Sequence, residues 1–132
     1  MCGIFGSFNR SPSPRFDEQL QAARRLLQHR GPNDHGLQHI SVGAGQVALG
    51  QTRLSIIDLT SGGHQPMSSQ DGRYVIVFNG EIYNYRELRE ELKAQGCRFT
   101  SDSDTEVLLA AWAVWGAACL LRLVGMFAFA VL

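Results

Sequence analysis

Glycine and proline divide this 132-residue chain into short apolar segments, each long enough for a single strand or helix. Some segments have the continuous or alternating apolar residues of strands, whereas others repeat apolar residues every three or four positions, as amphipathic helices do. The two kinds are mixed along the chain, and two strand-like segments flank a glycine-containing turn. This order predicts an α+β fold with hairpins and disfavours a purely parallel, doubly wound sheet.

Three segments have the signals of helices. Apolar residues recur on one face over 16–27, and Gly31-Pro32 follows that segment closely. Asn84 is a predicted helix cap, and the helix after it is expected to end before Gly96. Ser103 and Glu106 have capping-box spacing, which predicts a helix that continues through Trp115.

The remaining apolar segments favour strands, because they are short and rich in residues with high strand propensity. A break over 11–14 separates the first of them from the first helix. The final segment has no polar residue after its apolar run, so we expect the chain to end within a buried strand. The predicted strands cover residues 3–8, 40–42, 47–49, 54–59, 74–78, 97–100 and 123–132.

Length, charge and cysteine content exclude several classes of protein. The length fits one domain, and 12 basic residues balance 12 acidic ones, so no basic block is available to neutralise nucleic-acid phosphates. Three cysteines are too few for a disulfide framework, and neither they nor the four histidines have metal-ligand spacing. The amino terminus lacks the pattern of a signal peptide, and we expect a reducing, cytoplasmic setting.

The apolar stretch toward the carboxyl end predicts a buried helix rather than a membrane span. The uncharged run over 107–121 has 15 residues, whereas a membrane-spanning helix needs about 20. The run also contains Gly116 and follows the capping sequence at Ser103. We therefore expect no membrane association.

Cys2 is the first candidate for chemistry because of its position. If Met1 is removed, Cys2 carries both a thiol and a free α-amine, with ordinary pKa values of about 8.5 and about 7.7–8.0. Such a residue can supply both the nucleophile and the general base. Considered alone, Cys2 fits a small apolar residue at the start of the chain better than a nucleophile.

Motifs along the whole chain favour the chemical role. In their order and sequence they resemble the glutaminase domain of the asparagine synthases (glutamine-hydrolysing), which are class II glutamine amidotransferases. The matching motifs are MCGIFG at 1–6, HRGPNDHG at 29–36, RLSIIDL at 53–59, GGHQPM at 62–67, FNGEIYNY at 78–85, SDTEV at 103–107 and GMFAFA at 125–130.

The resemblance implies a fold and a reaction. The expected fold is the four-layer αββα sandwich of N-terminal-nucleophile hydrolases, incomplete at its carboxyl end. Cys2 would attack the side-chain amide of glutamine, and its α-amine would act as the base. Asn79 and Gly80 match the oxyanion hole, where amide N–H groups stabilise the tetrahedral intermediate. Without the surrounding motif, Asn79-Gly80 would predict a hairpin turn.

The resemblance also assigns the glutamine-binding residues. Arg53 would pair with the α-carboxylate of glutamine and Asp104 with its α-ammonium group, although each also fits an ordinary structural position. An arginine at a strand edge is usually solvated, and an aspartate in the first turn of a helix is favoured by the helix dipole. The other residues implied in this site are Leu54, Ser55, Ile56, Ile57 and Glu81.

The same resemblance bounds the domain and its partners. Residues 1–132 would form a truncated glutaminase domain without cofactor or metal. The synthetase domain, which uses ATP and Mg²⁺, would be its partner in the parent chain. The resemblance leaves open whether the domain also forms a homodimer. Two alternatives remain: the glutaminase domain of an amidophosphoribosyltransferase or glucosamine-phosphate synthase, and a catalytically inert fragment.

Overall fold

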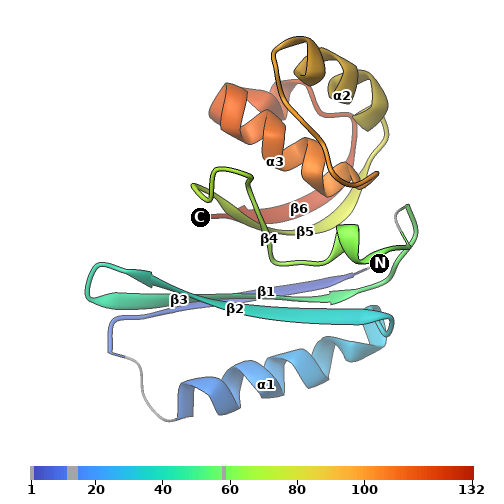
Figure 1. The fold of residues 1–132 in the computed structure, drawn as a ribbon. Coiled ribbons are helices and arrows are strands. Elements are labelled where there is room, and N and C mark those ends of the chain that lie inside the picture. Colours follow the sequence, from blue (N-terminus) through green and yellow to red (C-terminus); the bar gives the residue numbers. More distant parts are fainter. Residues whose placement is uncertain (1, 12–14, 58) are drawn as a thin grey trace.

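A computed structural model describes residues 2–11, 15–57 and 59–132 (Figure 1). Met1, most of the predicted break over 11–14, and Asp58 lie outside the described residues. Within these ranges the chain forms two three-stranded sheets and three α-helices. The elements are β1 (Gly3–Asn9), α1 (Arg15–Leu27), η1 (Gln28–Arg30), β2 (Asp34–Val42), β3 (Gly45–Arg53), η2 (Ser61–Gly63), β4 (Met67–Ser68), β5 (Val75–Ile82), α2 (Tyr85–Ala94), α3 (Asp104–Trp115), η3 (Gly116–Leu121) and β6 (Gly125–Val131).

Both sheets are antiparallel, in agreement with the predicted α+β class. The first has the strand order β1-β3-β2, and β3 places Thr52 opposite both Gly3 and His35. The second has the order β4-β5-β6, with Phe78 opposite Phe129. The amino-terminal strand β1 therefore pairs with residues that lie 37 (46 − 9) to 49 (52 − 3) positions further along the chain.

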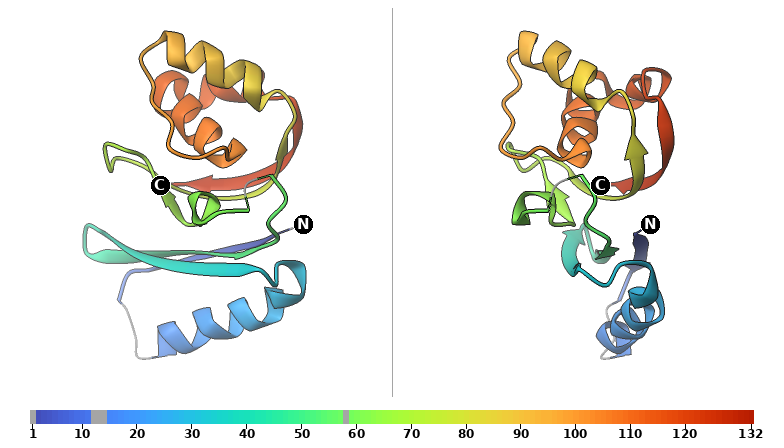
Figure 2. Two further views of the ribbon diagram at one scale, coloured as in Figure 1. Left: turned by 45° about the vertical axis from the view of Figure 1, so that its right-hand side comes forward. Right: turned by 90° about the vertical axis from the view of Figure 1, so that its right-hand side faces the viewer.

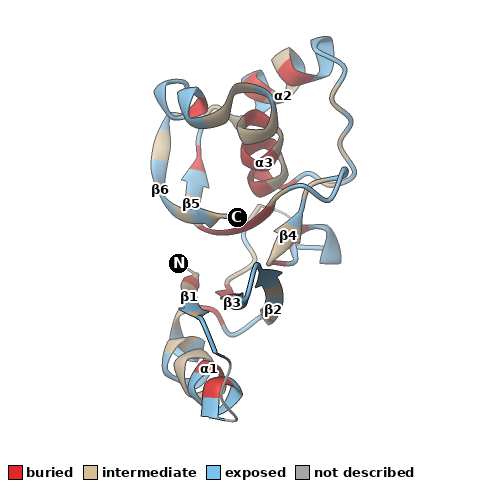
Figure 3. Cartoon of the chain, turned by 90° about the vertical axis from the view of Figure 1, so that its left-hand side faces the viewer, coloured by how far each residue is buried: buried red, intermediate tan, exposed pale blue. Residues whose placement is uncertain are grey.

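The helices cover the outer faces of the two sheets, which lie one above the other (Figures 1 and 2). Phe16 and Leu20 of α1 pack against Ala48 on the first sheet. Between the sheets lies a cluster that includes Leu49 and Val77. On the far face of the second sheet, α2 and α3 enclose the largest apolar cluster, and Figure 3 shows the buried residues concentrated along α3 and β5.

Most of the predicted elements are present. The first strand, the 16–27 helix and the helix after Ser103 have nearly the predicted bounds, and the predicted hairpin is formed by β2 and β3. The central strand β5 is longer than expected, and Asn79 and Gly80 lie within it instead of following it or forming a turn. Residues 80 and 127 are paired in its ladder with β6.

The predicted strand over 54–59 is wrong, because the described residues of this segment form a loop. Side chains from other parts of the chain bond the backbone here in place of a neighbouring strand. The Leu54 N–H donates to Cys2 Sγ over 3.3 Å, and the Ser55 N–H donates to Asn33 Oδ1 over 3.1 Å.

The predicted strand over 97–100 is also wrong. The Glu106 carboxylate accepts hydrogen bonds from the backbone N–H and hydroxyl groups of both Thr100 and Ser101. On the other side, the Arg89 guanidinium donates to the carbonyl oxygens of Ser101 and Ser103. Within 97–100 itself, the Cys97 N–H donates to the Leu92 carbonyl and the Arg98 carbonyl accepts from Gln70 Nε2, so backbone groups that a strand would have paired have other partners.

The caps of α2 and α3 differ in part from the prediction. Ser103 caps α3 by accepting from the Thr105 N–H, but Glu106 bonds the preceding loop instead of returning to Ser103. Asn84 precedes α2 without capping it, because its side chain bonds Arg122 O and the Val124 N–H.

The last strand, β6, is not fully buried, which corrects the prediction for the carboxyl-terminal segment. Its residues alternate between half-buried and exposed. Phe127, Phe129 and Val131 pack against the α2–α3 cluster, and Trp112 meets Phe129 edge to face. The opposite face of β6 is exposed because the first sheet contacts the second mainly through β5.

One apolar segment, Asp104–Leu121, meets the length and composition of a membrane-spanning helix, which by itself is weak evidence. In the fold, its α-helix ends at Trp115, and Gly116 follows with a φ of +57°. Val107 and Leu108 are fully buried in the α2–α3 cluster. The segment therefore forms a core helix and a short 3-10 extension.

Glu106 provides a test of how the 100–103 loop is held. We expect Glu106→Gln to lower the free energy of unfolding at pH 7 by about 1–3 kcal/mol, because an amide oxygen accepts these hydrogen bonds less strongly than a carboxylate. Burial acts to raise the pKa of Glu106, but the bonds from Thr100 and Ser101 outweigh it and hold the pKa below 4.5. The stabilisation is therefore present above pH 4.5 and is lost as the pH falls through the folded-state pKa.

Urea unfolding at pH 7 and at pH 3 measures this difference. The matched control is Glu90→Gln, which removes an exposed partner of Lys93 one helical turn away and should change stability by about 0.5 kcal/mol at most. Equal losses in the two variants at pH 7 would show that Glu106 does not hold the loop.

Candidate active site

Polar side chains gather at one end of the space between the two sheets. Alternate residues of a strand point to the same face, so one set of residues on β1, β3 and β5 faces this space. Toward one end of these strands the inward residues change from apolar to polar. The apolar ones are Ile4, Leu49, Val75 and Val77, and the polar ones are Cys2, Gln51, Arg53, Asn79 and Glu81.

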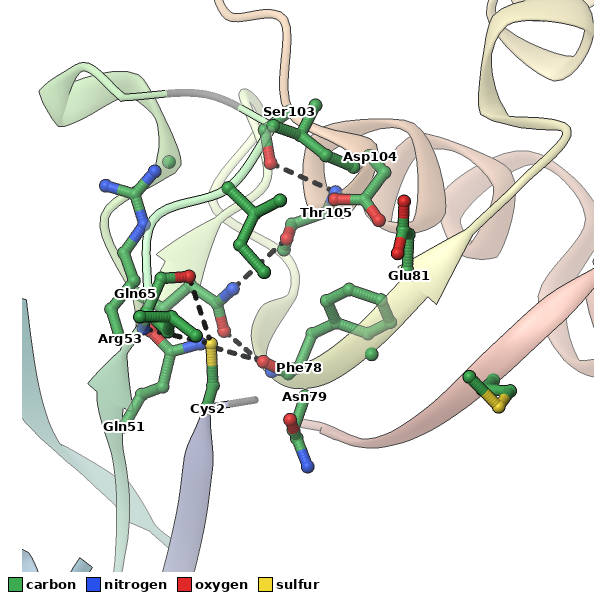
Figure 4. A pocket seen from close by; sticks show the side chains of 16 residues that line it. Cys2, Gln51, Arg53, Gln65, Phe78, Asn79, Glu81, Ser103, Asp104 and Thr105 are labelled. Carbon is green, nitrogen blue, oxygen red and sulfur yellow. Dashed lines mark hydrogen bonds between the residues drawn. The ribbon is translucent and has the colours of Figure 1, made fainter. Parts of the chain in front are cut away.

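These polar residues line an open cavity of about 170 Å³ (Figure 4). The cavity also receives the first turn of α3, the loop after β3, and Gly63 and Gln65 near η2. Nine of the ten residues predicted from the sequence lie on its wall: Cys2, Arg53, Leu54, Ile56, Ile57, Asn79, Gly80, Glu81 and Asp104. Ser55 does not line it.

The Cys2 thiol is held against the loop that follows β3. Its sulfur accepts from the Leu54 N–H over 3.3 Å and lies 3.7 Å from the Leu54 carbonyl oxygen, to which the S–H can donate. The carbonyl of Cys2 accepts from Arg30 Nε over 3.0 Å. The thiol is therefore positioned by backbone groups at the wall of the cavity while the residue stays partly accessible.

Beside the cavity, one edge of β5 is not covered by another strand. The partner β4 has only two residues and reaches β5 at Val75 and Ile76. Because N–H and C=O groups alternate sides in an antiparallel ladder, those of Phe78, Gly80 and Ile82 point toward this open edge. They need partners other than a strand.

Side chains form hydrogen bonds with the backbone at two of these three residues, Phe78 and Ile82. The Phe78 N–H donates to Gln65 Oε1 over 2.6 Å, and the Phe78 C=O accepts from Gln51 Nε2 over 2.7 Å. The Ile82 N–H donates to Asp104 Oδ2 over 3.0 Å. The described residues offer no hydrogen-bond partner to the Gly80 N–H, which lies between them and faces the cavity. An N–H group in this situation is available to a ligand.

Two neighbouring features complete this part of the wall. Asn79 Oδ1 is buried and finds no hydrogen-bond partner among the described residues. At Gly80, a Cβ atom would lie 2.6 Å from Phe127 Cα on β6, so only glycine fits the strand spacing there. An unpaired Asn79 amide thus lies beside an N–H group whose position depends on a glycine.

Opposite charges lie on two sides of the cavity (Figure 4). Arg53 is only 8% exposed; its Nη1 donates to the Thr60 carbonyl over 2.9 Å, and its guanidinium lies so close to Gly63 that a side chain there would collide with it. Asp104 is 6% exposed in the first turn of α3. A zwitterionic amino acid, with its carboxylate toward Arg53 and its ammonium group toward Asp104, matches this arrangement.

The environment of Asp104 makes its ionised carboxylate less favourable than it is in water. Burial raises the pKa of Asp104, and the nearby Glu81 charge raises it further, whereas backbone hydrogen bonds from Ile82 and Thr105 act in the opposite direction. The net result is a pKa above the ordinary value of 3.8. An ammonium group beside this carboxylate would favour the ionised form.

Gln51, Gln65 and Thr105 were not predicted as part of the site. Both glutamine amides bond the backbone of Phe78, and Gln65 Nε2 also donates to Thr105 Oγ1 over 3.1 Å. Glutamine carries no titratable group that would mark it in a sequence. The only available signal for Gln65 was its place in the motif over 62–67, and Gln51 had none.

The described residues contain no group of three histidine, cysteine, aspartate or glutamate side chains that could hold a metal ion. The cavity wall presents a thiol, the Arg53 guanidinium, the Glu81 and Asp104 carboxyl groups and a set of amide groups. Such a set fits nucleophilic attack on a carbonyl carbon of a bound amino acid.

Comparison with known proteins agrees with this description. The family model for the glutamine amidotransferase domain matches residues 1–132. The chain is 48% identical to asparagine synthetase [glutamine-hydrolyzing] 1 of Bacillus subtilis, over 98% of this chain and 20% of the relative. It is 37% identical to asparagine synthetase B [glutamine-hydrolyzing] of Escherichia coli, over 98% of this chain and 23% of the relative.

A fungal relative has another name: amidase chry2 of Gibberella zeae is 35% identical over 98% of this chain and 20% of its own length. The chain thus spans about a fifth of the length of these curated relatives. Their similarity extends over almost all of this chain, and the family model covers every residue of it. The chain belongs to the family of glutamine amidotransferase domains.

Proposed function

We propose that this chain hydrolyses glutamine to glutamate and ammonia, with Cys2 as an N-terminal nucleophile. The observation that carries the proposal is the cavity itself, whose wall brings together the Cys2 thiol, the unpaired Gly80 N–H and the opposite charges of Arg53 and Asp104. The proposed fold type is the αββα sandwich of N-terminal-nucleophile hydrolases. The order of the layers, from α1 through the two sheets to α2 and α3, supports it.

The proposed reaction begins once Met1 has been removed. The α-amine of Cys2 takes the thiol proton, and Sγ attacks the carboxamide carbon of glutamine. The oxyanion that forms is stabilised by the Gly80 N–H and the side-chain amide of Asn79. The carbon–nitrogen bond then breaks, the nitrogen receives the proton from the α-amine, and ammonia leaves. Water hydrolyses the remaining thioester to glutamate and restores the thiol.

The use of the ammonia is proposed from the relatives. Because the B. subtilis and E. coli relatives are named as glutamine-hydrolysing asparagine synthetases, we propose that the ammonia passes to a synthetase domain that makes asparagine from aspartate. ATP and Mg²⁺ would act in that domain and not on the residues of this chain. A cytoplasmic location belongs to the same proposal.

The test is intact-mass spectrometry of the protein after reaction with a diazo-ketone analogue of glutamine. We expect a mass without Met1 and a single adduct that maps to Cys2. A parallel reaction with iodoacetamide shows whether the thiol is accessible at all. A processed Cys2 that reacts with iodoacetamide but not with the analogue would overturn the proposed glutamine site.

Asp104 gives a sharper prediction, because its charge has opposite effects on binding and on stability. We expect Asp104→Asn to raise the KM for glutamine roughly 10- to 100-fold, the effect of losing one charged partner of the α-ammonium group. The free energy of unfolding at pH 7 should be unchanged or higher. A raised folded-state pKa means that the ionised carboxylate is disfavoured in the fold, so its removal relieves that cost.

The upward direction of the Asp104 pKa shift also determines how the free energy of unfolding depends on pH. The stability that Asp104 contributes falls as the pH rises from 3.8 through the raised folded-state pKa, and this slope should disappear in the variant. Asp102→Asn is the matched control, because the Asp102 side chain is 96% exposed two residues earlier. An unchanged KM in Asp104→Asn would remove Asp104 from the glutamine site.

A further inference from the structure

Gln51 has a buried oxygen that the fold leaves without a partner. The residue is 1% exposed, and its Nε2 donates to the Phe78 carbonyl over 2.7 Å. That bond fixes which end of the amide is nitrogen and leaves Oε1 on the other side. Among the described residues Oε1 has no hydrogen-bond partner. A buried acceptor in this state carries a desolvation cost unless a donor from outside the fold meets it.

The location of Gln51 limits what that donor can be. Gln51 lines the same cavity as Cys2, and the two side chains enter it from the neighbouring strands β3 and β1 (Figure 4). Asn79 Oδ1, the other buried oxygen without a partner, belongs to a residue of the same cavity wall. These two unmatched side-chain oxygens are acceptors, whereas the unpaired Gly80 N–H is a donor, so the ligand that they suit carries both N–H groups and an acceptor oxygen, as a carboxamide does.

The α-amine of Cys2 is a less suitable donor for Gln51. The Arg53 carbonyl accepts from the Asn33 N–H, so the backbone N–H and C=O groups of Arg53 point toward β2. Because these groups alternate sides along a strand, those of the other odd-numbered residues of β3 also point toward β2, and those of the even-numbered residues point toward β1. Thr52 therefore shares the backbone bonds with Gly3, and the backbone nitrogen of Cys2 points to the other edge of β1. Gln51 extends from β3, away from that edge.

We infer that Gln51 Oε1 binds the nitrogen of the substrate carboxamide and so holds the leaving group. This inference rests on the proposed function and adds a residue to it. The carboxamide –NH₂ has two donors, and one of them would meet Oε1 while the carbonyl oxygen lies toward the Gly80 N–H. As the carbon–nitrogen bond breaks and the nitrogen gains its proton, the same oxygen accepts from the departing ammonia.

A substrate without N–H groups at this position tests the inference. The γ-methyl ester of glutamate undergoes the same attack by Cys2 and loses methanol, but its ester oxygen offers no hydrogen to Gln51. In the natural protein, kcat/KM for glutamine relative to the ester contains the contribution of Gln51. We expect Gln51→Met to lower this ratio about tenfold, the effect of one hydrogen bond.

Gln65→Met is the matched control. It removes the other glutamine bond to Phe78, and the Gln65 side chain has no unpaired oxygen. If Gln65→Met only disturbs the position of Phe78, kcat/KM should fall by the same factor for glutamine and for the ester, and their ratio should stay unchanged. Gln51→Glu provides a second variant that keeps an acceptor while losing the donor to Phe78, and it should retain the preference for glutamine.

Each outcome decides the inference. An unchanged ratio in Gln51→Met, with both substrates slowed equally, would make Gln51 a positioning residue only. A lost preference in Gln51→Glu would also overturn the inference, and this result does not depend on whether Gln51→Met folds. If the natural protein hydrolysed neither substrate, the proposed function itself would fail, which is a distinct result from an unchanged ratio.

Discussion

Cys2→Ala is expected to lower glutamine hydrolysis by roughly 10³-fold or more, because no other described group in the cavity is a nucleophile of comparable strength. The Cys2 sulfur is held by the Leu54 backbone at the wall of the cavity, and alanine removes the attacking atom while changing little of the packing. If a synthetase domain uses the ammonia as proposed, synthesis from free ammonia should continue in Cys2→Ala, since that reaction does not need the thiol. Ammonia release from glutamine and ammonia-dependent product formation are the two measurements.

Cys97→Ala is the control for Cys2→Ala, because Cys97 is a free and partly buried thiol that lies outside the cavity. It should leave glutamine hydrolysis within about twofold of the natural protein, as expected for a residue that touches no reacting atom. Continued glutamine hydrolysis in Cys2→Ala would show that the nucleophile is assigned wrongly. Loss of both activities would instead point to a general defect in folding.

Gly80→Ala has the second largest expected effect, because it acts on the fold and on the oxyanion site together. A Cβ at this position would collide with the Met126 carbonyl and lie 2.6 Å from Phe127 Cα, so β5 and β6 would have to separate. The strand cannot easily shift, since Phe78 and Ile82 on either side are bonded by buried side chains. We expect the free energy of unfolding to fall by about 3 kcal/mol.

Displacement of the Gly80 N–H should also slow glutamine hydrolysis by roughly 10²-fold or more in the molecules that remain folded. Urea unfolding and initial rates well below the unfolding midpoint measure the two effects separately. The control is Gly6→Ala on β1, where a Cβ would lie 3.2 Å from its nearest neighbours and a small adjustment suffices. Equal behaviour of the two variants would show that the close approach at Gly80 has no special role.

The parts of the fold that could be predicted from the sequence are those with local causes. The helix after Ser103 was predicted correctly because its cap, its apolar residues and Gly116 are all within a few positions of it. The strands at 54–59 and 97–100 were predicted wrongly because their backbone groups are satisfied by distant side chains. For the second segment these are Gln70, which bonds the Arg98 carbonyl, and Glu106, which bonds the Thr100 N–H, and the sequence does not reveal that they converge there.

The candidate site shows the same division. The motifs placed nine of the ten assigned residues around one cavity, although the roles of those residues stay predictions until the variants are measured. Gln51 and Gln65 were missed because their importance depends on the shortness of β4, which leaves an edge of β5 open at Phe78. Asn79 and Gly80 were expected after a strand, yet β5 continues through both of them to Ile82.

The pairing of β1 with β3 also has a consequence for how the protein folds. Gly3 meets Thr52 across a long stretch of chain, and the cavity then needs the second sheet and α3 to close around Cys2. Contacts between residues so distant in sequence form late and slowly, since a long loop must be closed before any of them is made. An incompletely folded chain would therefore have the thiol but no pocket for glutamine. Release of ammonia would begin only when the last long-range contacts have formed, and its onset during refolding would report completion of the fold.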